Sequence, residues 1–300
     1  MGDTTTGSPG LDTVGACGSL KIMSRRGFGS LVVILLIAGL VVAGVFWYLL
    51  ESSSSSHSTS SLQLPAATSS EVQSSSTFSI NISVAQGAAA AALAQLSQYP
   101  FLSLTPVDRS INASTFPTSA QQFTYEGISL KLPWSGTPQI QSRQGVGTQI
   151  KFADGDFVML ANPYPDQLIR QEFMSSIKTT DDQAKFNYLF GQDNLQSNVL
   201  FFNLVLNSSL QSLTSSTLSP QELFAQSMLL PIKLTLFFDS SAQAIYRFST
   251  PNFRVFEITD LPLKNQSYIF LYDDQDNGRL ITTSANQEDI DFILASAHNQ

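Results

Sequence analysis

Histidine and cysteine, the side chains that most often act as nucleophiles, bases or zinc ligands, are scarce in this chain. Among 300 residues there are two histidines and one cysteine. Cys17 lies near the N-terminus, His57 lies in a serine-rich stretch, and His298 lies two residues before the end of the sequence. Ser-His and Cys-His sites, and ordinary zinc sites, need several such side chains close together. The composition of residues 80–300 therefore predicts neither kind of site. We assign no catalytic, cofactor-binding or metal-binding residue.

An acidic cluster at residues 273–278 is similar to a calcium-binding loop. The EF-hand pattern, started at Asp273, requires Asp or Asn at its third position and Glu at its twelfth. Here those positions hold Gln275 and Ser284. Asn277-Gly278 is instead the preferred dipeptide of a two-residue type I′ turn. The sequence therefore favours a hairpin turn over a calcium site.

Two pairs of carboxylates could serve acid–base chemistry, as in a glycoside hydrolase. They are Asp154 with Asp156, and Asp181 with Asp182. The first pair falls in a predicted turn and the second at a predicted helix start. Acidic residues are favoured at both places for structural reasons. We expect structural roles for all four.

Two turns near the start of the predicted sheet have a binding and a structural interpretation. Gly145-Val146-Gly147 is too short for a phosphate-binding loop and is expected to join two strands. Trp134 could be presented for binding by the turn Pro133–Gly136. A ring tucked under the sheet edge is the more ordinary arrangement, because tryptophan buries a large apolar surface.

Arg247 and Arg254 fall on adjacent predicted strands. Together they could bind an anion. Cross-strand pairing with Glu257 or Asp260 is the simpler expectation, because opposite charges on neighbouring strands attract.

Charge is low and unevenly distributed. Charged residues make up 13% of the chain and its net charge is −8. Residues 1–27 carry a net charge of +1, the serine-rich stretch carries −2, and the chain from Asp108 onward carries −7. Nucleic-acid binding needs concentrated positive charge. We therefore expect no nucleic-acid partner.

The strongest signal in the sequence is an apolar run between Arg26 and Glu51. Its 24 residues carry no charge, and as a helix they span about 36 Å, enough to cross a bilayer core of about 30 Å. We predict a transmembrane helix at residues 28–50, with the lipid bilayer as its partner. Basic residues at 21, 25 and 26 precede it, and Trp47 and Tyr48 lie at its far end. The positive-inside rule places residues 1–27 in the cytoplasm as a tail and the rest of the chain outside.

Other interpretations of this run remain open. A cleaved signal peptide usually has a shorter apolar region and a small-residue cleavage site, whereas this run ends in Phe46–Leu50. Arg26-Gly27-Phe28 with the apolar run resembles the cleavage site of type IV prepilins. That family has glutamate at the fifth residue after the cut, where this chain has Val32. Small residues at 39, 43 and 44 would also allow close packing with a second helix.

The residues after the membrane segment divide into three parts. Residues 51–79 are dominated by serine and predict a disordered linker, because too little apolar surface is available to offset chain entropy. Residues 80–120 are a transitional segment in which the alanine-rich stretch 88–94 predicts a short helix. Residues 121–300 predict the extracytoplasmic domain.

Hydrophobic periodicity in this domain changes along the chain. Alternation at Ile128–Leu132 and a turn at Ala153–Asp156 predict an antiparallel meander over residues 123–162. The run Val199–Leu206 is typical of a buried helix, with a central strand as the alternative. Ser219-Pro220-Gln221-Glu222 carries the signature of a helix start. Further helices are predicted around 169–177, 186–190 and 290–297, and further strands around 246–248, 256–258, 268–272 and 280–283.

This order predicts an α+β fold, a largely antiparallel sheet with helices packed against it. It loosely resembles the Mog1/PsbP-like architecture, a likeness of fold that implies no function. From the anchor, the linker and the scarcity of catalytic residue types, we expect a membrane-anchored interaction or assembly module with an unknown protein partner. A small-ligand or metal-binding domain is the alternative, and a carboxylate-only hydrolase is the third hypothesis.

Overall fold

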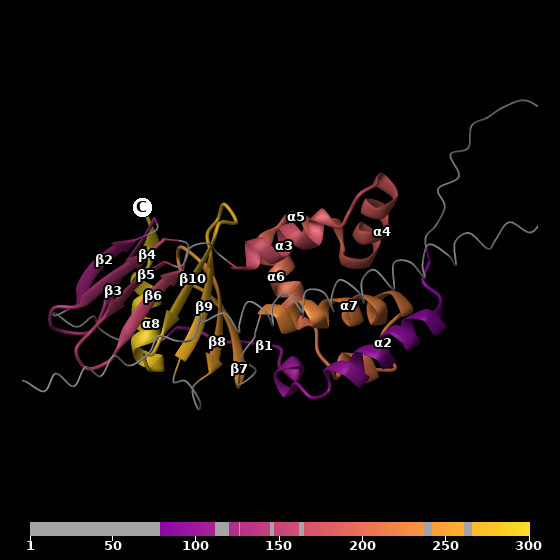
Figure 1. Ribbon diagram of the computed structural model, residues 1–300, viewed down its shortest axis with the longest axis horizontal. Helices are drawn as coiled ribbons and strands as arrows, with labels where there is room; N and C mark the ends of the chain where they lie inside the picture. Colours follow the sequence, from indigo (N-terminus) through magenta and orange to yellow (C-terminus); the bar gives the residue numbers. More distant parts are fainter. Residues whose placement is uncertain are drawn as a thin grey trace, which may run out of the picture.

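The computed structural model describes residues 79–111, 120–125, 127–144, 147–161, 165–236, 242–260 and 266–300, without the side chains of residues 165–168 and 260. The predicted tail 1–27, membrane helix 28–50 and linker 51–79, apart from residue 79, lie outside these residues. No helix within the described ranges is both long enough and apolar enough to cross a bilayer. Most helices gather at one end of the long axis, whereas the two sheets and the last helix lie at the other (Figure 1).

An eight-stranded sheet organises the fold, in the order β1-β7-β8-β9-β10-β6-β5-β4. Only the β1–β7 pair is parallel among these strands. A three-stranded sheet has the order β11-β3-β2 and is antiparallel. The strands are β1 (Pro106–Asp108), β2 (Gln121–Tyr125), β3 (Ile128–Leu132), β4 (Gln139–Arg143), β5 (Gly147–Lys151), β6 (Phe157–Ala161), β7 (Ala244–Ser249), β8 (Arg254–Asp260), β9 (Gln266–Tyr272), β10 (Gly278–Thr283) and β11 (His298–Asn299).

The predicted α+β class is therefore confirmed. The helices are α2 (Ile82–Leu96), α3 (Pro165–Ser175), α4 (Thr180–Phe190), α5 (Gln192–Gln196), α6 (Asn198–Asn207), α7 (Pro220–Leu236) and α8 (Gln287–Ser296), with 3₁₀ turns at Pro100–Ser103 and Ser212–Thr214. From β2 onward the order is strands, a helical block, strands and helix α8, as the periodicity predicts, and the short strand β11 follows α8. The alanine-rich stretch forms a helix of 15 residues that packs along α7.

The centre of the large sheet is buried on both faces. On β9, Phe270 and Tyr272 face the helices, while Ile269 and Leu271 face the opposite side. Successive side chains of a strand point to opposite faces, so a strand that is apolar on both must lie between two cores. The prediction of a central strand at Tyr268–Tyr272 is confirmed.

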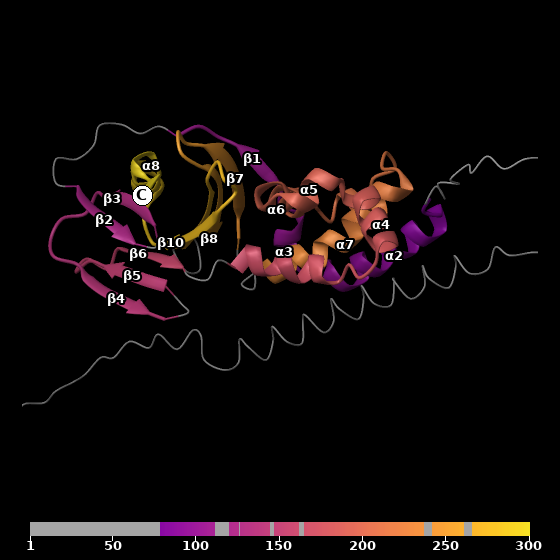
Figure 2. The same cartoon turned by 90° about the horizontal axis from the view of Figure 1, so that it is seen from above.

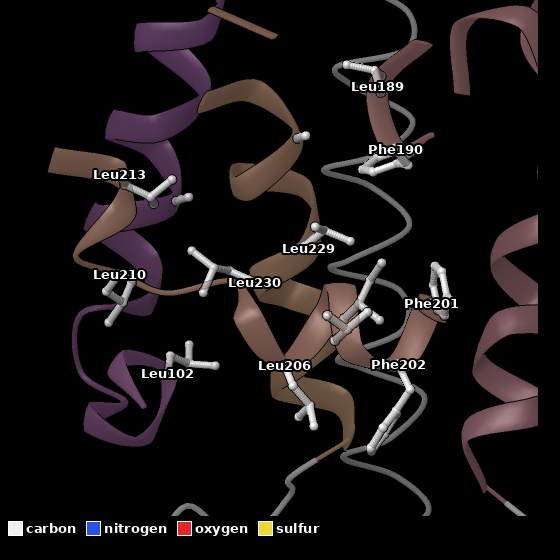
Figure 3. Packing of buried hydrophobic residues seen from close by; sticks show 14 of the residues in the cluster. Leu102, Leu189, Phe190, Phe201, Phe202, Leu206, Leu210, Leu213, Leu229 and Leu230 are labelled. Carbon is white, nitrogen blue, oxygen red and sulfur yellow. The ribbon is translucent and has the colours of Figure 1, made fainter. Parts of the chain in front are cut away.

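The helix-side core joins α2–α7 to strands β7–β10. Phe202 of α6 packs against three rings of the sheet, with its centroid 4.6 Å from that of Phe270, 5.2 Å from Phe256 and 5.7 Å from Tyr272. Figure 3 shows Phe202 and Leu206 of α6 beside Leu229 and Leu230 of α7. The interpretation of Val199–Leu206 as a buried helix is thus confirmed.

A second core lies on the other face, between the large sheet, α8 and the three-stranded sheet (Figure 2). Trp134 belongs to this core and is 7% exposed. Its Nε1 donates to Asp289 Oδ2 at 3.2 Å, and its ring packs edge-on against Phe152. The structural interpretation of Trp134 is therefore confirmed.

A fully buried lysine in α7 hydrogen-bonds to three backbone carbonyl groups of neighbouring segments. Lys233 Nζ donates to the carbonyl oxygens of Leu206 at 2.9 Å, Ser208 at 2.6 Å and Leu104. Burial lowers the pKa of Lys233 to about 7. Only the ammonium form has three N–H donors for these three acceptors. The charged lysine thus satisfies carbonyls at the C-terminal end of α6, where a cation is also favoured by the helix dipole.

Two details of the sequence-based prediction are wrong. The meander over 123–162 is divided, because β2 and β3 belong to the small sheet and β4–β6 to the large one. The β9–β10 hairpin also has no two-residue turn at Asn277-Gly278. Asp273 and Asn277 pair across a three-residue loop, and Asp276 has the positive φ of 64°. Aspartate tolerates this conformation, and its carboxylate has a distant partner described below.

At Gly147, the first residue of β5, the backbone lies very close to the backbone of Leu160 in β6. Its φ is +126°, and an added Cβ would lie 2.0 Å from the carbonyl oxygen of Leu160. We expect Gly147→Ala to lower the free energy of unfolding by about 3 kcal/mol or more.

Gly87→Ala is the matched control, because Gly87 lies inside α2 with open space around its Cα. We expect that variant to gain about 0.5–1 kcal/mol. Urea unfolding of the chain in detergent micelles, followed by circular dichroism, measures both. A loss below about 1 kcal/mol for Gly147→Ala would contradict the clash.

Candidate functional site

A polar pocket of about 480 Å³ lies where several connecting segments meet at one end of the sheets. The turn before β3, the β7–β8 turn, the β9–β10 loop and the last residues of the chain form its walls. Its lining is Gly127, Asn252, Asp273, Asp274, Gln275, Asn277, Arg279, His298, Asn299 and Gln300. Apart from Gly127, every lining residue has a polar or charged side chain.

The β9–β10 loop is fixed on its pocket side by Asp273. Its Oδ1 accepts the backbone N–H groups of Gln275 at 2.9 Å and Asn277 at 2.8 Å. Its Oδ2 accepts Asn299 Nδ2 at 3.0 Å, which joins the loop to β11. Burial opposes ionisation of this carboxyl, but the hydrogen bonds from Asn277, Gln275 and Asn299 outweigh it and lower the pKa of Asp273. Asp273 is thus a charged structural group that holds the loop in shape.

The same loop is fixed on its other side by Asp276, which caps helix α6. Asp276 Oδ1 accepts the N–H of Val199 at 2.8 Å and the hydroxyl of Ser197 at 3.2 Å. Its Oδ2 accepts the N–H of Asn198. A carboxylate at a helix N-terminus satisfies free N–H groups and complements the dipole. One loop therefore borders the pocket and anchors the helical layer.

These contacts occupy two of the three carboxylates in the acidic cluster. Asp273 is occupied by its own turn and by Asn299, while Asp276 is occupied by α6. The predicted hairpin is confirmed, with the different turn noted above. Within the part of the chain that the structure describes, no three His, Cys, Asp or Glu side chains converge as metal ligands would.

Groups that remain available in the pocket are suited to hydrogen bonding. Asp274 and Gln275 are exposed at its rim. His298 Nδ1 lies 3.1 Å from the carbonyl oxygen of Ser296, so Nδ1 is the donor and Nε2 is open to a ligand. Carboxylate, amide and imidazole groups can bind a polar ligand or the polar side chains of a partner.

A cluster of largely buried charges lies elsewhere, between β8, α8 and the residue that follows β1. Arg109 Nη2 is 2.6 Å from Glu257 Oε2 and 2.7 Å from Asp291 Oδ1. Its guanidinium also stacks over Phe248, 4.1 Å from the ring centroid. Burial raises the pKa of Glu257, although Arg109 opposes the shift. Glu257 Oε1 and Arg109 Nε have no hydrogen-bond partner among the described residues, which marks this triad as a costly arrangement.

The predicted cross-strand pairing of Arg247 with Glu257 is therefore wrong. Arg247 points to the opposite face of the sheet and pairs with Asp108, Nε to Oδ1 at 2.8 Å, and its Nη1 donates to Asn203 at 3.0 Å. Sequence reasoning missed Arg109 because it lies in the segment 80–120, where no strand was predicted. The only available signal was Glu257 between the apolar residues Phe256 and Ile258 of a strand, because a buried carboxylate requires a cation or hydrogen-bond donors nearby.

The two carboxylate pairs have the structural roles that the sequence predicts. Asp181 pairs with Lys185 at 2.6 Å, and Asp182 forms a capping box with Thr179 at the start of α4. Asp154 Oδ1 accepts the N–H of Asp156 within the β5–β6 turn. Burial and the neighbouring Asp154 raise the pKa of Asp156. Neither pair lies in the pocket.

Comparison with protein-family models gave no match, and a search of curated proteins found none with significant similarity.

Arg109→Met tests the buried triad. The change leaves Glu257 and Asp291 without their shared cation, and we expect a loss of about 3–5 kcal/mol in the free energy of unfolding at pH 7. Arg247→Met breaks the exposed pair with Asp108 and should cost far less, because water screens that pair. Equal losses in the two variants, measured by urea unfolding, would contradict the special role of Arg109.

Glu257→Gln tests the pH dependence of the same triad. Because the pKa of Glu257 is raised on folding, its protonation stabilises the fold. This contribution is present below the ordinary pKa of about 4.5 and is lost as the pH rises through the raised value. We therefore expect the stability of Glu257→Gln relative to the unaltered chain to increase between pH 4.5 and pH 7.5. A difference that is constant across this range would show that Glu257 has an ordinary pKa.

Proposed function

We propose that the chain is a membrane-anchored extracytoplasmic interaction module. Residues 28–50 form its transmembrane helix, residues 1–27 its cytoplasmic tail, and residues 51–79 the linker that holds the folded domain away from the bilayer. The charge-free run and the basic residues before it support this topology. The arrangement of a hairpin-led antiparallel sheet and helices is similar to the Mog1/PsbP-like architecture, a likeness of fold alone.

The observation that carries the binding role is the polar pocket built from connecting segments. Binding residues commonly lie on loops positioned by a rigid scaffold. Here the β7–β8 turn and the β9–β10 loop extend from strands buried on both faces, and the loop is fixed by Asp273 and Asp276. The pocket is thus held in shape before any partner arrives, which lowers the entropic cost of binding.

The position of the pocket suits a tethered domain. The described chain begins with α2 at the helical end of the molecule, whereas the pocket segments belong to the sheet half (Figure 1). A linker that joins at residue 79 therefore attaches to the end away from the pocket. The pocket remains accessible when the chain is anchored.

Binding fits the pocket better than hydrolysis does. A carboxylate-only hydrolase needs one acid that can hold a proton and a second acid across the scissile bond. Asp273 and Asp274 are adjacent in sequence, and the lowered pKa of Asp273 keeps that carboxylate charged and occupied by its loop. Asp273 is therefore a poor proton donor.

The second candidate function is binding of a small polar ligand. The volume of about 480 Å³ lies within the range of about 300–1,000 Å³ that is typical of small-molecule pockets. The lining has amide, carboxylate, guanidinium and imidazole groups and no Phe, Tyr or Trp side chain. A hydroxylated or zwitterionic compound would suit it, and an apolar compound would not.

A photoreactive amino acid in place of Gln275, in the full-length chain in its own membranes, tests the proposed function. We expect discrete adducts in which a second polypeptide is joined to the chain, and their loss when Asp274→Arg is added. Gln211 is the matched control position, because it is an exposed glutamine of the helical layer. Adducts of equal yield from both positions, or none from either, would sink the proposal.

A small-ligand role gives a different result in the same experiment. No polypeptide adduct forms, and a compound that co-purifies with the chain is lost in the Asp274→Arg variant. Mass spectrometry of the purified protein separates the two outcomes.

A further inference from the structure

Among the described residues, strand β4 is the terminal strand of the large sheet, and it lies outside both cores. Within this part of the chain it pairs with β5 alone, and its five side chains are all exposed. No β4 residue belongs to either cluster of buried hydrophobic residues within the described structure. Figure 2 shows β4 at the margin of the sheet, away from helices α2–α7. One side of this strand therefore presents unpaired N–H and C=O groups to solvent.

The two faces of β4 differ in chemistry. Gln139, Gln141 and Arg143 lie on one face, opposite Lys151, Gln149 and Gly147 of β5. Ile140 lies on the other face, opposite the buried Ile150, and is 45% exposed. The edge thus offers a basic, amide-rich face and a second face on which exposed Ile140 lies beside Ser142.

The opposite edge of the sheet is protected in the usual ways. Strand β1 has three residues and starts with Pro106, which lacks an N–H group. Asp108 at its end is occupied by Arg247. Proteins shorten, interrupt or charge their edge strands to prevent unwanted pairing. Strand β4 has five residues and no proline, and its only charge is Arg143.

Charge indicates which kind of strand this edge would accept. Strands β4 and β5 carry Arg143 and Lys151 and no acidic residue, in a chain of net charge −8. Asp154 and Asp156 lie in the turn beyond Lys151, so the positive charge is least compensated at Arg143. Neither Arg143 nor Lys151 forms an ion pair with any described residue.

We propose that β4 is a docking strand for an extended segment of a partner protein in which acidic and aliphatic residues alternate. The acidic side chains lie on the face of Arg143 and Lys151, and the aliphatic side chains lie beside Ile140. Backbone hydrogen bonds provide affinity and the alternating side chains provide specificity, as in other strand-addition complexes. This surface is separate from the pocket, so the proposal stands independently of the proposed function.

A second copy of the chain fits the edge less well. Each chain has a net charge of −8, which disfavours the close approach of two copies. An antiparallel pair of β4 strands centred on Gln141 would also set Arg143 opposite Gln139 of the second copy, so neither arginine would gain a partner of opposite charge. An acidic partner segment gains from the same charges.

The test uses the full-length chain in nanodiscs of phosphatidylcholine and two labelled, end-capped octapeptides. One alternates Glu and Val, and the other alternates Lys and Val. We expect fluorescence anisotropy to show binding of the Glu–Val peptide only, and hydrogen exchange to slow at residues 139–143 when it binds. Arg143→Glu should weaken binding about fivefold or more, whereas Arg254→Glu, the same charge change on exposed Arg254 of β8, should not.

Three results would overturn the proposal. They are equal affinity for the two peptides, binding that leaves exchange at residues 139–143 unchanged, and slowed exchange there when the protein alone is concentrated. The last result would assign the edge to a second copy. Asp274→Arg changes the pocket and not β4, so it should leave peptide binding unchanged. A failure of the pocket proposal can therefore be distinguished from a failure of the β4 proposal.

Discussion

Strands β7–β10 are apolar on both faces, and this constraint determines how the rest of the chain must be arranged. Two buried faces require two coverings, which the helical layer provides on one side and α8 with the small sheet provides on the other. The helical layer covers β7–β10 and reaches Ala161 of β6, and Figure 2 shows β4 and β5 away from these helices. Strand β4 is left beyond both coverings, which is why its edge is exposed. The same double burial makes the scaffold rigid at the point where the pocket segments leave it.

Three charged side chains lie at contacts between the layers or within the helical layer, and each one bonds to a specific element. Lys233 satisfies carbonyls within the helical layer, Arg109 joins β8 to α8, and Asp276 joins the β9–β10 loop to α6. Such groups are costly to bury and strongly destabilising when their partners are removed. The loop between Asp273 and Asp276 is therefore unusual in serving two purposes. It shapes the pocket and anchors the helices, so that both depend on one hairpin.

Local patterns in the sequence predict most elements of this fold but few of its long-range contacts. The cap at Ser219–Glu222, the apolar run Val199–Leu206 and the central strand Tyr268–Tyr272 are confirmed because each depends on nearby residues. The partner of Glu257 and the turn at Asn277-Gly278 were predicted wrongly because Arg109 and α6, which decide them, lie far away along the chain. The pocket could not be predicted either, because four distant segments form it and its acidic residues also suit an ordinary turn.

The account depends on one topological claim, that residues 28–50 cross the membrane and place the folded domain outside. Cys17 is the single cysteine of the sequence, so labelling with a membrane-impermeant maleimide in intact cells tests this directly. A second probe is Ser135→Cys in a Cys17→Ser background, since Ser135 is exposed on the folded domain. We predict that the Ser135 variant is labelled in intact cells and that Cys17 is labelled only after lysis. Labelling of Cys17 in intact cells, with the Ser135 variant protected, would contradict the account.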